Sequence, residues 1–315
     1  MARLSDRKIV IITRKTRIEE LVLRYNTLEQ ARFYVEHLGA DFSDYLAEDQ
    51  QYKTAVAEVE NQAMESGRVQ LLDRAYLPNF IFGPDDLVVT VGQDGLVANT
   101  VKYLSDQAII GVNPDPDRWD GVLLPFRGKD AGKIIRDVLA QKRRVKEITL
   151  AQAALTNGQT LYAVNDLFIG PKSHTSARYS LECGGEGETQ SSSGVIVSTG
   201  LGSTGWLKSI LAGARALTRL AGGLPDEAHA KNDDGHFPWS ADYLLYSVRE
   251  PFPSRTTSVS MAFGRIEMDR PLIITSMMAT GGVIFSDGME NDFLEFNSGQ
   301  KAVIQVADKK GRLVV

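Results

Sequence analysis

The sequence has almost no cysteine: Cys183 is the only one among 315 residues. A chain with one thiol cannot form an internal disulfide, and this usage is typical of a reducing compartment. No stretch approaches the roughly 20 apolar residues that a transmembrane helix needs. The amino-terminal MARLSDRK also lacks the apolar core of a secretion signal. We therefore expect a cytoplasmic protein with no membrane partner.

The chain also lacks an excess of basic residues, because 35 Lys and Arg stand against 40 Asp and Glu. Gripping a nucleic-acid backbone requires a basic surface, so no nucleic-acid partner is expected. The four histidines have no nearby Cys or carboxylate partners at metal-site spacing, and no metal-ligating residue is predicted. The remaining composition is that of an ordinary globular protein, and the length is sufficient for two domains.

The order of the predicted elements divides the chain into two parts. In the first part, apolar runs such as KIVIIT (8–13) and AIIGVN (108–113) alternate with stretches of helical spacing. Strands separated by helices indicate a mostly parallel sheet. From residue 146 onward, short β-rich runs are separated by turn pairs such as Asp287-Gly288. We predict an α/β domain over 1–145 and a β-rich domain over 146–296.

Residues 200–205, GLGSTG, match the G-x-G-x-x-G pattern of dinucleotide-binding turns. In a dehydrogenase this turn opens a βαβ unit, and an acidic residue closes the second strand about 20 residues on. Here a predicted helix (206–221) leads into the polar segment 222–239, which contains no apolar strand around Asp226. A dehydrogenase is therefore not predicted. The loop still offers backbone N–H groups at a helix N-terminus to a ligand, and a tight turn without a ligand is the alternative.

The segment VTVGQDGLVANTVKYL ends a predicted strand at a glycine turn with one carboxylate, Asp94, and then begins a helix. Ligands of α/β sheets bind beyond such strand ends. The alternative is that Asp94 only caps its helix. The strand-Gly-x-Asp-Gly-helix pattern resembles the GGDGT motif of NAD kinases and of the wider lipid- and diacylglycerol-kinase superfamily.

Further segments extend this resemblance over nearly the whole chain in the expected order. VNDLFIG, with Asn165 and Asp166, resembles the Asn-Glu/Asp motif of the family, and SSGVIVSTGLGSTGW resembles its second glycine-rich motif. VIITRKTRIEELVLRY, IIGVNPDPDRWDGVLLP, Trp206 in place of a tyrosine, and YSVREP resemble the mitochondrial-type NAD kinases and their bacterial relatives. From the residues alone, Asn165-Asp166 could be a plain turn and Trp206 a core residue.

The resemblance implies an NAD kinase-like fold with a β-sandwich-like second domain and a last strand pair (297–315) that returns to the first domain. The active site would lie in the cleft between the domains. Asp94 would lie beside the 2′-hydroxyl that is phosphorylated, and the donor phosphates would lie on Gly92 and Gly95. The implied NAD-binding residues are Asn165, Asp166, Thr204, Gly205, Trp206 and Ser209. Among them, Asn165 and Asp166 would bind ribose hydroxyls, and Trp206 would offer a flat surface for stacking.

The implied reaction transfers a phosphoryl group from ATP or another donor to NAD(H) and gives NADP(H). Mg²⁺ would offset the charge of the donor phosphates, and the protein would be a homo-oligomer, a dimer or a tetramer. However, GGDGT is GQDGL here, so that Gln93 replaces a glycine and Leu96 replaces a hydroxyl. Two alternatives follow from this departure: a non-catalytic dinucleotide-binding protein, or a related kinase that acts on a lipid or a nucleoside.

Overall fold

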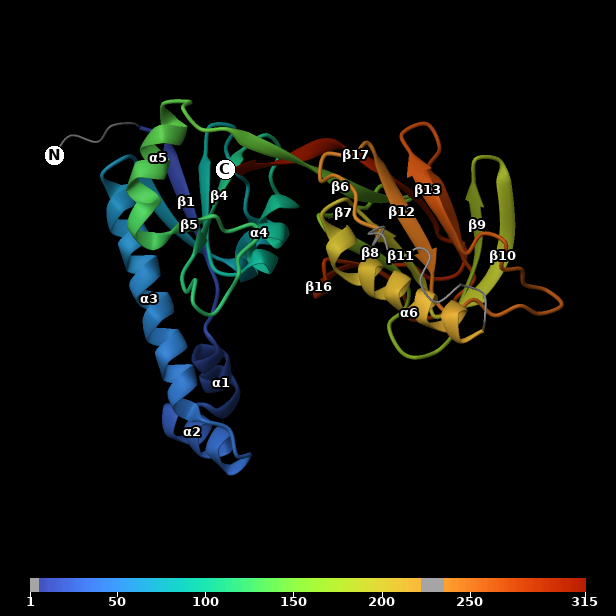
Figure 1. The fold of residues 1–315 in the computed structure, drawn as a ribbon, viewed down its shortest axis with the longest axis horizontal. Coiled ribbons are helices and arrows are strands. Elements are labelled where there is room, and N and C mark those ends of the chain that lie inside the picture. Colours follow the sequence, from blue (N-terminus) through green and yellow to red (C-terminus); the bar gives the residue numbers. More distant parts are fainter. Residues whose placement is uncertain (1–5, 222–234) are drawn as a thin grey trace. The chain divides into compact units, whose positions relative to one another are not determined.

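The computed structural model describes residues 6–221 and 235–315. The chain divides into two compact units, shown in Figure 1: unit 1 is Met1–Lys146 with Arg312–Val315, and unit 2 is Glu147–Gly311. The division falls one residue after the predicted boundary, and the returning segment is shorter than 297–315. Most of the predicted loop 222–239, including Asp226, lies outside the described residues.

Unit 1 is built on a parallel sheet with strand order β2–β1–β3–β4, and both β5 and the last residues of β17 also pair with β4. The strands are β1 (Lys8–Thr13), β2 (Arg68–Asp73), β3 (Leu87–Val91), β4 (Ala108–Asn113), β5 (Phe126–Arg127) and the end of β17 (Lys301–Val314). The strands β1, β3 and β4 are almost fully buried and rich in Val and Ile. This composition is typical of parallel strands that are covered on both faces.

Helices connect the strands of unit 1. They are α1 (Arg17–Tyr25), α2 (Leu28–His37), α3 (Phe42–Met64), α4 (Asp94–Val101) and α5 (Ala131–Leu139), with short 3-10 turns η1 (Arg74–Asn79) and η2 (Gly128–Asp130). The helices α3, α4 and α5 pack on the sheet, whereas α1 and α2 form a separate cluster with the start of α3. Val59 of α3 and Ile135 of α5 belong to the same buried cluster as Ile9 and Val89 of the sheet. No helix in the described part of the chain combines the length and the apolar composition that crossing a membrane requires.

Unit 2 consists of two sheets that enclose one apolar core. One sheet has the order β13–β12–β11–β8–β15–β16, and in the other β10–β9–β14–β17 is extended by β6 and β7. The strands are β6 (Val145–Leu155), β7 (Thr160–Ala163), β8 (Asp166–Pro171), β9 (Ala177–Cys183), β10 (Glu186–Ser192), β11 (Val195–Ser198), β12 (Tyr243–Val248), β13 (Phe263–Glu267), β14 (Leu272–Ser276), β15 (Gly282–Ser286), β16 (Met289–Glu295) and the first part of β17.

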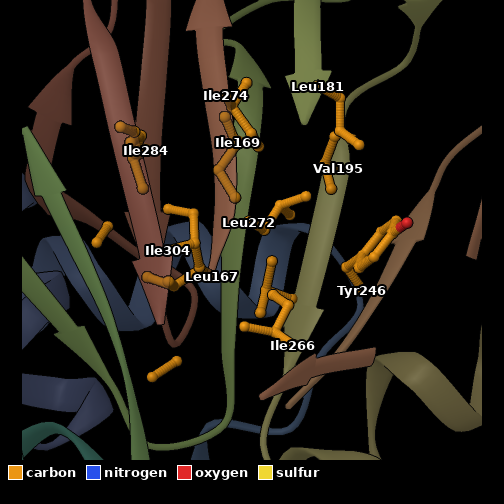
Figure 2. Packing of buried hydrophobic residues seen from close by; sticks show 14 of the residues in the cluster. Leu167, Ile169, Leu181, Val195, Tyr246, Ile266, Leu272, Ile274, Ile284 and Ile304 are labelled. Carbon is orange, nitrogen blue, oxygen red and sulfur yellow. The ribbon is translucent and has the colours of Figure 1, made fainter. Parts of the chain in front are cut away.

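The core of unit 2 lies between these sheets (Figure 2). Leu167 and Val195 of the six-stranded sheet belong to one buried cluster with Leu181, Leu272 and Ile304 of the other sheet. Alternate residues of β9 and β14 are buried, as expected of strands that show one face to a sandwich core. The predicted fold class, an α/β domain with a mostly parallel sheet followed by a β-sandwich-like domain, is confirmed.

The strand before GLGSTG also decides how this motif is interpreted. β11 pairs antiparallel with both β8 and β12. The turn η3 (Gly202–Thr204) and the helix α6 (Trp206–Leu220) follow it. A dehydrogenase fingerprint joins parallel strands of a βαβ unit, so this loop has a different context. The prediction that the motif is not a dehydrogenase turn is confirmed.

Candidate functional site

Unit 2 contains a cavity of about 540 Å³ beside the loop that joins β11 to α6. This volume is in the usual range for small-molecule sites. Five of the six predicted NAD-binding residues line the cavity: Asn165, Asp166, Thr204, Gly205 and Trp206. Ser209 lies further along α6, where its hydroxyl donates to the Gly205 carbonyl at 3.4 Å, and it does not line the cavity. The structure therefore brings most of the predicted set together, and their binding roles stay predictions.

Aromatic rings form one wall of the cavity. Trp206 stacks on Phe168 with ring centres 6.0 Å apart and planes 14° apart, and Phe168 stacks on Phe285 in a similar way at 6.2 Å. Trp206 is 39% exposed, so it is not a core residue, and that alternative for Trp206 is wrong. A flat, accessible ring beside two others offers a stacking surface to a planar ligand such as a nucleobase. Sequence reasoning missed Phe168 and Phe285. Both are partly buried residues within strands, β8 and β15, and an apolar residue in a strand gives no sign that it faces a cavity.

Close backbone contacts explain the glycines of the loop. A Cβ on Gly200 would overlap the carbonyl oxygen of Pro238, and a Cβ on Gly202 would overlap that of Asn165. Thr199 joins the same segments, because its backbone N–H donates to the Asn165 carbonyl at 2.9 Å. These two glycines are therefore required by the packing of protein segments against each other, independently of any ligand.

Asp287 holds the Asn165-Asp166 segment in place. Asp287 and Gly288 have φ values of 53° and 70° and form the two-residue turn between β15 and β16 that the Asp-Gly pair predicts. The Asp287 carboxylate accepts hydrogen bonds from the backbone N–H groups of Val164, Asn165 (2.6 Å) and Asp166. The sequence signals the turn, but it gives no sign that this carboxylate organises a segment more than 120 positions away.

Asp166 carries an unsatisfied acceptor. Its Oδ1 is buried and has no hydrogen-bond partner in the described part of the chain, although the residue as a whole is partly exposed at the cavity. Burial raises the pKa of Asp166 to about 7, with the Asp287 charge adding to the effect and a hydrogen bond from Ser198 opposing it. A buried acceptor without a partner is costly, and Asp166 lines the cavity, so a hydroxyl donor that reaches this carboxylate would be bound favourably. A plain turn would need neither a buried carboxylate oxygen nor a raised pKa at this position.

In unit 1, Asp94 is the first residue of α4 and follows the buried strand β3. Its Oδ1 accepts from the Leu123 N–H at 2.7 Å, and its Oδ2 accepts from the Val122 N–H at 3.1 Å. The helix has no side-chain cap. Asp94 is thus not merely a helix cap, because its carboxylate fixes the loop that follows β4.

The departures from GGDGT fit the backbone of this loop. Gln93 has a φ of −109°, which any residue adopts, so the position does not need a glycine. Leu96 is buried, and a Cβ on Gly92 would approach its Cδ2 to 2.7 Å, so the leucine packs directly against Gly92. Gly95 is exposed and has open space around it, so nothing in the described structure obstructs a ligand at that position.

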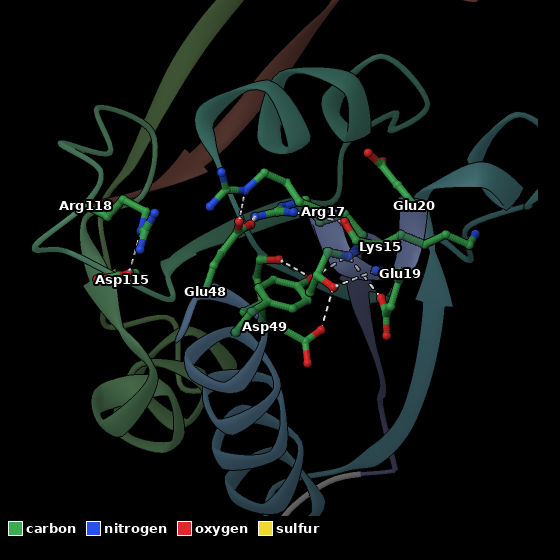
Figure 3. A network of polar contacts seen from close by, with 12 residues as sticks. Lys15, Arg17, Glu19, Glu20, Glu48, Asp49, Asp115 and Arg118 are labelled. Atoms are coloured by element: carbon green, nitrogen blue, oxygen red, sulfur yellow. Dashed lines mark hydrogen bonds and ion pairs between the residues drawn. The ribbon is translucent and has the colours of Figure 1, made fainter. Parts of the chain in front are cut away.

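A polar network joins the strand ends near this loop (Figure 3). The hydroxyl of Tyr52 accepts from the Arg14 N–H at 2.8 Å and donates to the Val91 carbonyl at 3.0 Å, so one side chain connects the ends of β1 and β3. Burial raises the pKa of Tyr52 to about 12. Glu48 is buried and accepts from Arg14 and Arg17. Figure 3 shows Glu48 and Arg17 facing each other. This network gives the carboxyl edge of the sheet a fixed shape.

The same network reaches the loop after β4. Arg118 donates to both carboxylate oxygens of Asp44, at 2.6 and 3.1 Å, and lies 3.3 Å from Asp115. The hydrogen bonds from Arg118 hold the pKa of Asp44 well below its usual range. The loop is therefore anchored twice in unit 1, through Asp94 and through Arg118. In the described residues, no group of three or more His, Cys, Asp or Glu side chains is arranged to hold a metal ion.

Comparisons with known proteins agree on the fold. The chain is similar to the crystal structure of an NAD kinase from Archaeoglobus fulgidus in complex with ATP, with a TM-score of 0.54 and 15% identity over 98% of this chain and 93% of that one. It is also similar to yeast NADH kinase complexed with NADH, with a TM-score of 0.57 and 15% identity over 99% of this chain and 84% of that one. The chain has the NAD kinase fold. No protein-family model matches the sequence, and no curated protein matches it.

The resemblance to NAD kinases that the motifs predict is thus confirmed at the level of the fold. On this NAD kinase fold, Asp94, Gly92 and Gly95 share one loop of unit 1, and the predicted dinucleotide-binding residues share one cavity of unit 2. The catalytic, donor-binding and NAD-binding roles of these residues stay predictions.

Proposed function

We propose that this protein transfers a phosphoryl group from ATP or a related donor to the 2′-hydroxyl of the adenosine ribose of NAD(H), giving NADP(H). The observation that supports this most is the cavity of unit 2, where an aromatic wall stands beside a buried carboxylate oxygen without a partner. The first feature suits an adenine ring, and the second suits a ribose hydroxyl. The two similar structures described above, an NAD kinase and an NADH kinase, agree with this chemistry.

At the acceptor side, Trp206 and Phe168 would stack with the adenine. Asp166 would accept a hydrogen bond from a ribose hydroxyl, and Asn165 can both donate to and accept from the neighbouring hydroxyl. Asp287 keeps these two residues in place through their backbone N–H groups. Such pre-organisation lowers the barrier by fixing the reacting hydroxyl before the donor arrives.

At the donor side, the exposed Gly95 and the helix N-terminus at the start of α4, which has no side-chain cap, would receive phosphate oxygens. Phosphoryl transfer depends mainly on positioning and charge stabilisation, so Asp94 would orient the 2′-hydroxyl and take its proton late. The donor would enter with Mg²⁺ bound to its phosphates, and the ion would offset their negative charge. We also propose that the protein is cytoplasmic and works as a homo-oligomer, whose mass light scattering would measure.

The decisive experiment incubates the purified chain with NAD or NADH, Mg²⁺ and a panel of nucleotide and polyphosphate donors. NADP(H) is then measured with an NADP-specific dehydrogenase. The expected result is product that depends on both donor and enzyme and that is lost in Trp206→Ala. Absence of product with every donor at high enzyme concentration would contradict the proposal.

A second candidate is a dinucleotide-binding protein without catalytic activity. It is favoured by Leu96, whose apolar side chain is buried against Gly92 where the family motif has a threonine. The double variant Gln93→Gly/Leu96→Thr separates the two candidates. Activity that appears only in the double variant would support the binding protein, and activity already present in the native chain would exclude it.

A further inference from the structure

The cavity of unit 2 has an unusual charge distribution. Asp166, Asp287 and Glu290 line it, and Arg249 is the one cation among its described lining residues. A dinucleotide carries a diphosphate with two negative charges. Three carboxylates without a cation would repel such a ligand, so the position of the guanidinium decides whether the cavity can bind it.

Arg249 is both fixed and accessible. It follows β12, and its backbone donates to the Gly194 carbonyl at 2.8 Å and accepts from the Ser193 N–H at 2.9 Å. The guanidinium carbon lies 5.5 Å from the centre of the Trp206 ring, which places the charge beside the stacking surface. Its ion pair with Glu250 is long, at 3.6 Å, and the Glu250 side chain is 66% exposed. An exposed pair of this kind contributes little, so the guanidinium can bind a stronger anion at small cost.

We propose that Arg249 binds the diphosphate of the dinucleotide while Trp206 stacks with its adenine. This inference rests on the proposed function and specifies a further residue of the same site. A guanidinium donates two parallel hydrogen bonds to phosphate oxygens, which a lysine cannot reproduce. Arg249 therefore makes the cavity selective for adenosine compounds that carry a phosphate chain over adenosine itself.

The experiment measures the affinities of the purified chain for NAD and for adenosine by calorimetry, in the native protein, Arg249→Gln and Arg249→Lys. Arg249→Gln is expected to weaken NAD binding by about 10- to 100-fold and adenosine binding by less than about twofold, because only NAD has the diphosphate. The NAD affinity of Arg249→Lys should lie between those of the native protein and Arg249→Gln, since lysine keeps the charge and loses the bidentate geometry. The dependence of NAD affinity on salt should also become weaker in Arg249→Gln.

Arg265→Gln is the matched control, because Arg265 also lies over an aromatic ring, Tyr243 at 3.7 Å, but does not line the cavity. It should leave both affinities unchanged. Equal losses for NAD and adenosine in Arg249→Gln would mean that Arg249 only supports Trp206, and unchanged NAD affinity would mean that it contacts no phosphate; either result overturns the inference alone. If the native protein binds neither ligand, the proposed function fails and the inference fails with it.

Discussion

The Oδ1 atom of Asp94 accepts a hydrogen bond of 2.7 Å from the backbone N–H of Leu123. The proposed catalytic carboxylate is therefore also a structural anchor, because it joins the start of α4 to the loop after β4. A residue with both functions should affect activity and local stability together, and a variant series can separate the two effects.

Asp94→Asn keeps the shape of the side chain and removes its charge. We expect NADP formation to fall at least 100-fold. The free energy of unfolding should fall by about 1–2 kcal/mol, since two hydrogen bonds to a charged acceptor are weakened. Coupled assays and urea unfolding measure these quantities. Asp120→Asn, an exposed carboxylate of the same loop, is the control and should change neither. Full activity in Asp94→Asn would remove Asp94 from the proposed mechanism.

Asp166 should make stability depend on pH. Burial raises its pKa to about 7 in the folded state, against 3.8 for an unperturbed Asp. Between these values the folded chain keeps a proton that the unfolded chain has lost, so its stabilising contribution is complete below pH 3.8 and is lost as pH rises to about 7. Asp166→Asn removes this loss, which amounts to about 2–4 kcal/mol.

Chemical denaturation of the native protein and of Asp166→Asn between pH 5 and 8.5 tests this pH dependence. The difference in unfolding free energy between Asp166→Asn and the native chain should grow in favour of the variant as pH rises, and should level off above pH 7. The exposed Asp242→Asn serves as the comparison and should show no such trend. Parallel curves for the native protein and Asp166→Asn would show that this carboxyl does not titrate near neutral pH.

Two glycines of the loop should respond very differently to alanine. A Cβ on Gly202 would overlap the Asn165 carbonyl, whereas the nearest atom to a Cβ on Gly205 lies at 3.4 Å. Gly202→Ala should therefore separate the loop from the Asn165-Asp166 segment, lower the melting temperature by several degrees and abolish NAD binding. Gly205→Ala should leave the melting temperature within about two degrees of the native value. Similar melting temperatures for the two variants would contradict the close packing described for Gly202.

Removing Glu48 should strongly destabilise unit 1. Glu48→Ala takes away the carboxylate that pairs with Arg14 but leaves the Arg14 guanidinium, whose side chain is only 10% exposed, in its buried position. Removing one partner of a buried pair costs about 3–5 kcal/mol. Glu65→Ala, which breaks an exposed pair with Arg136 at the other end of α3, should cost less than about 1 kcal/mol. Equal costs in urea unfolding would show that burial of the Glu48 pair has no energetic weight.

Local patterns were sufficient to predict much of the fold. The strand Lys8–Thr13, the helix that begins at Trp206 and the turn at Asp287-Gly288 all have sequence signals that act within a few residues. The change from alternating helices and strands to consecutive strands likewise predicts the two kinds of domain. These signals depend on backbone preference and hydrophobic period, which tertiary contacts here reinforce.

The organisation of the site could not be predicted in the same way. The hydrogen bonds from Val164 and Asn165 to Asp287, and from Arg14 to Tyr52, connect positions far apart in the chain. The glycine at 202 is needed because of the Asn165 carbonyl, and no pattern within the loop contains that information. Arg249 lies in the segment YSVREP, but the resemblance of that segment gives this residue no role, and its relevance follows only from the three carboxylates that share its cavity.

The final residues of β17 have a consequence for how the protein is made. Arg312 and Leu313 pair with Ala108 and Ile109 of β4, while β5 pairs only with Val112 and Asn113. During translation, residues 108 and 109 of β4 therefore have no partner strand on that side until about 200 further residues have left the ribosome. The exposed backbone groups of such an edge can pair with strands of other nascent chains. We therefore expect chaperones to bind the early half of the polypeptide until β17 has been synthesised.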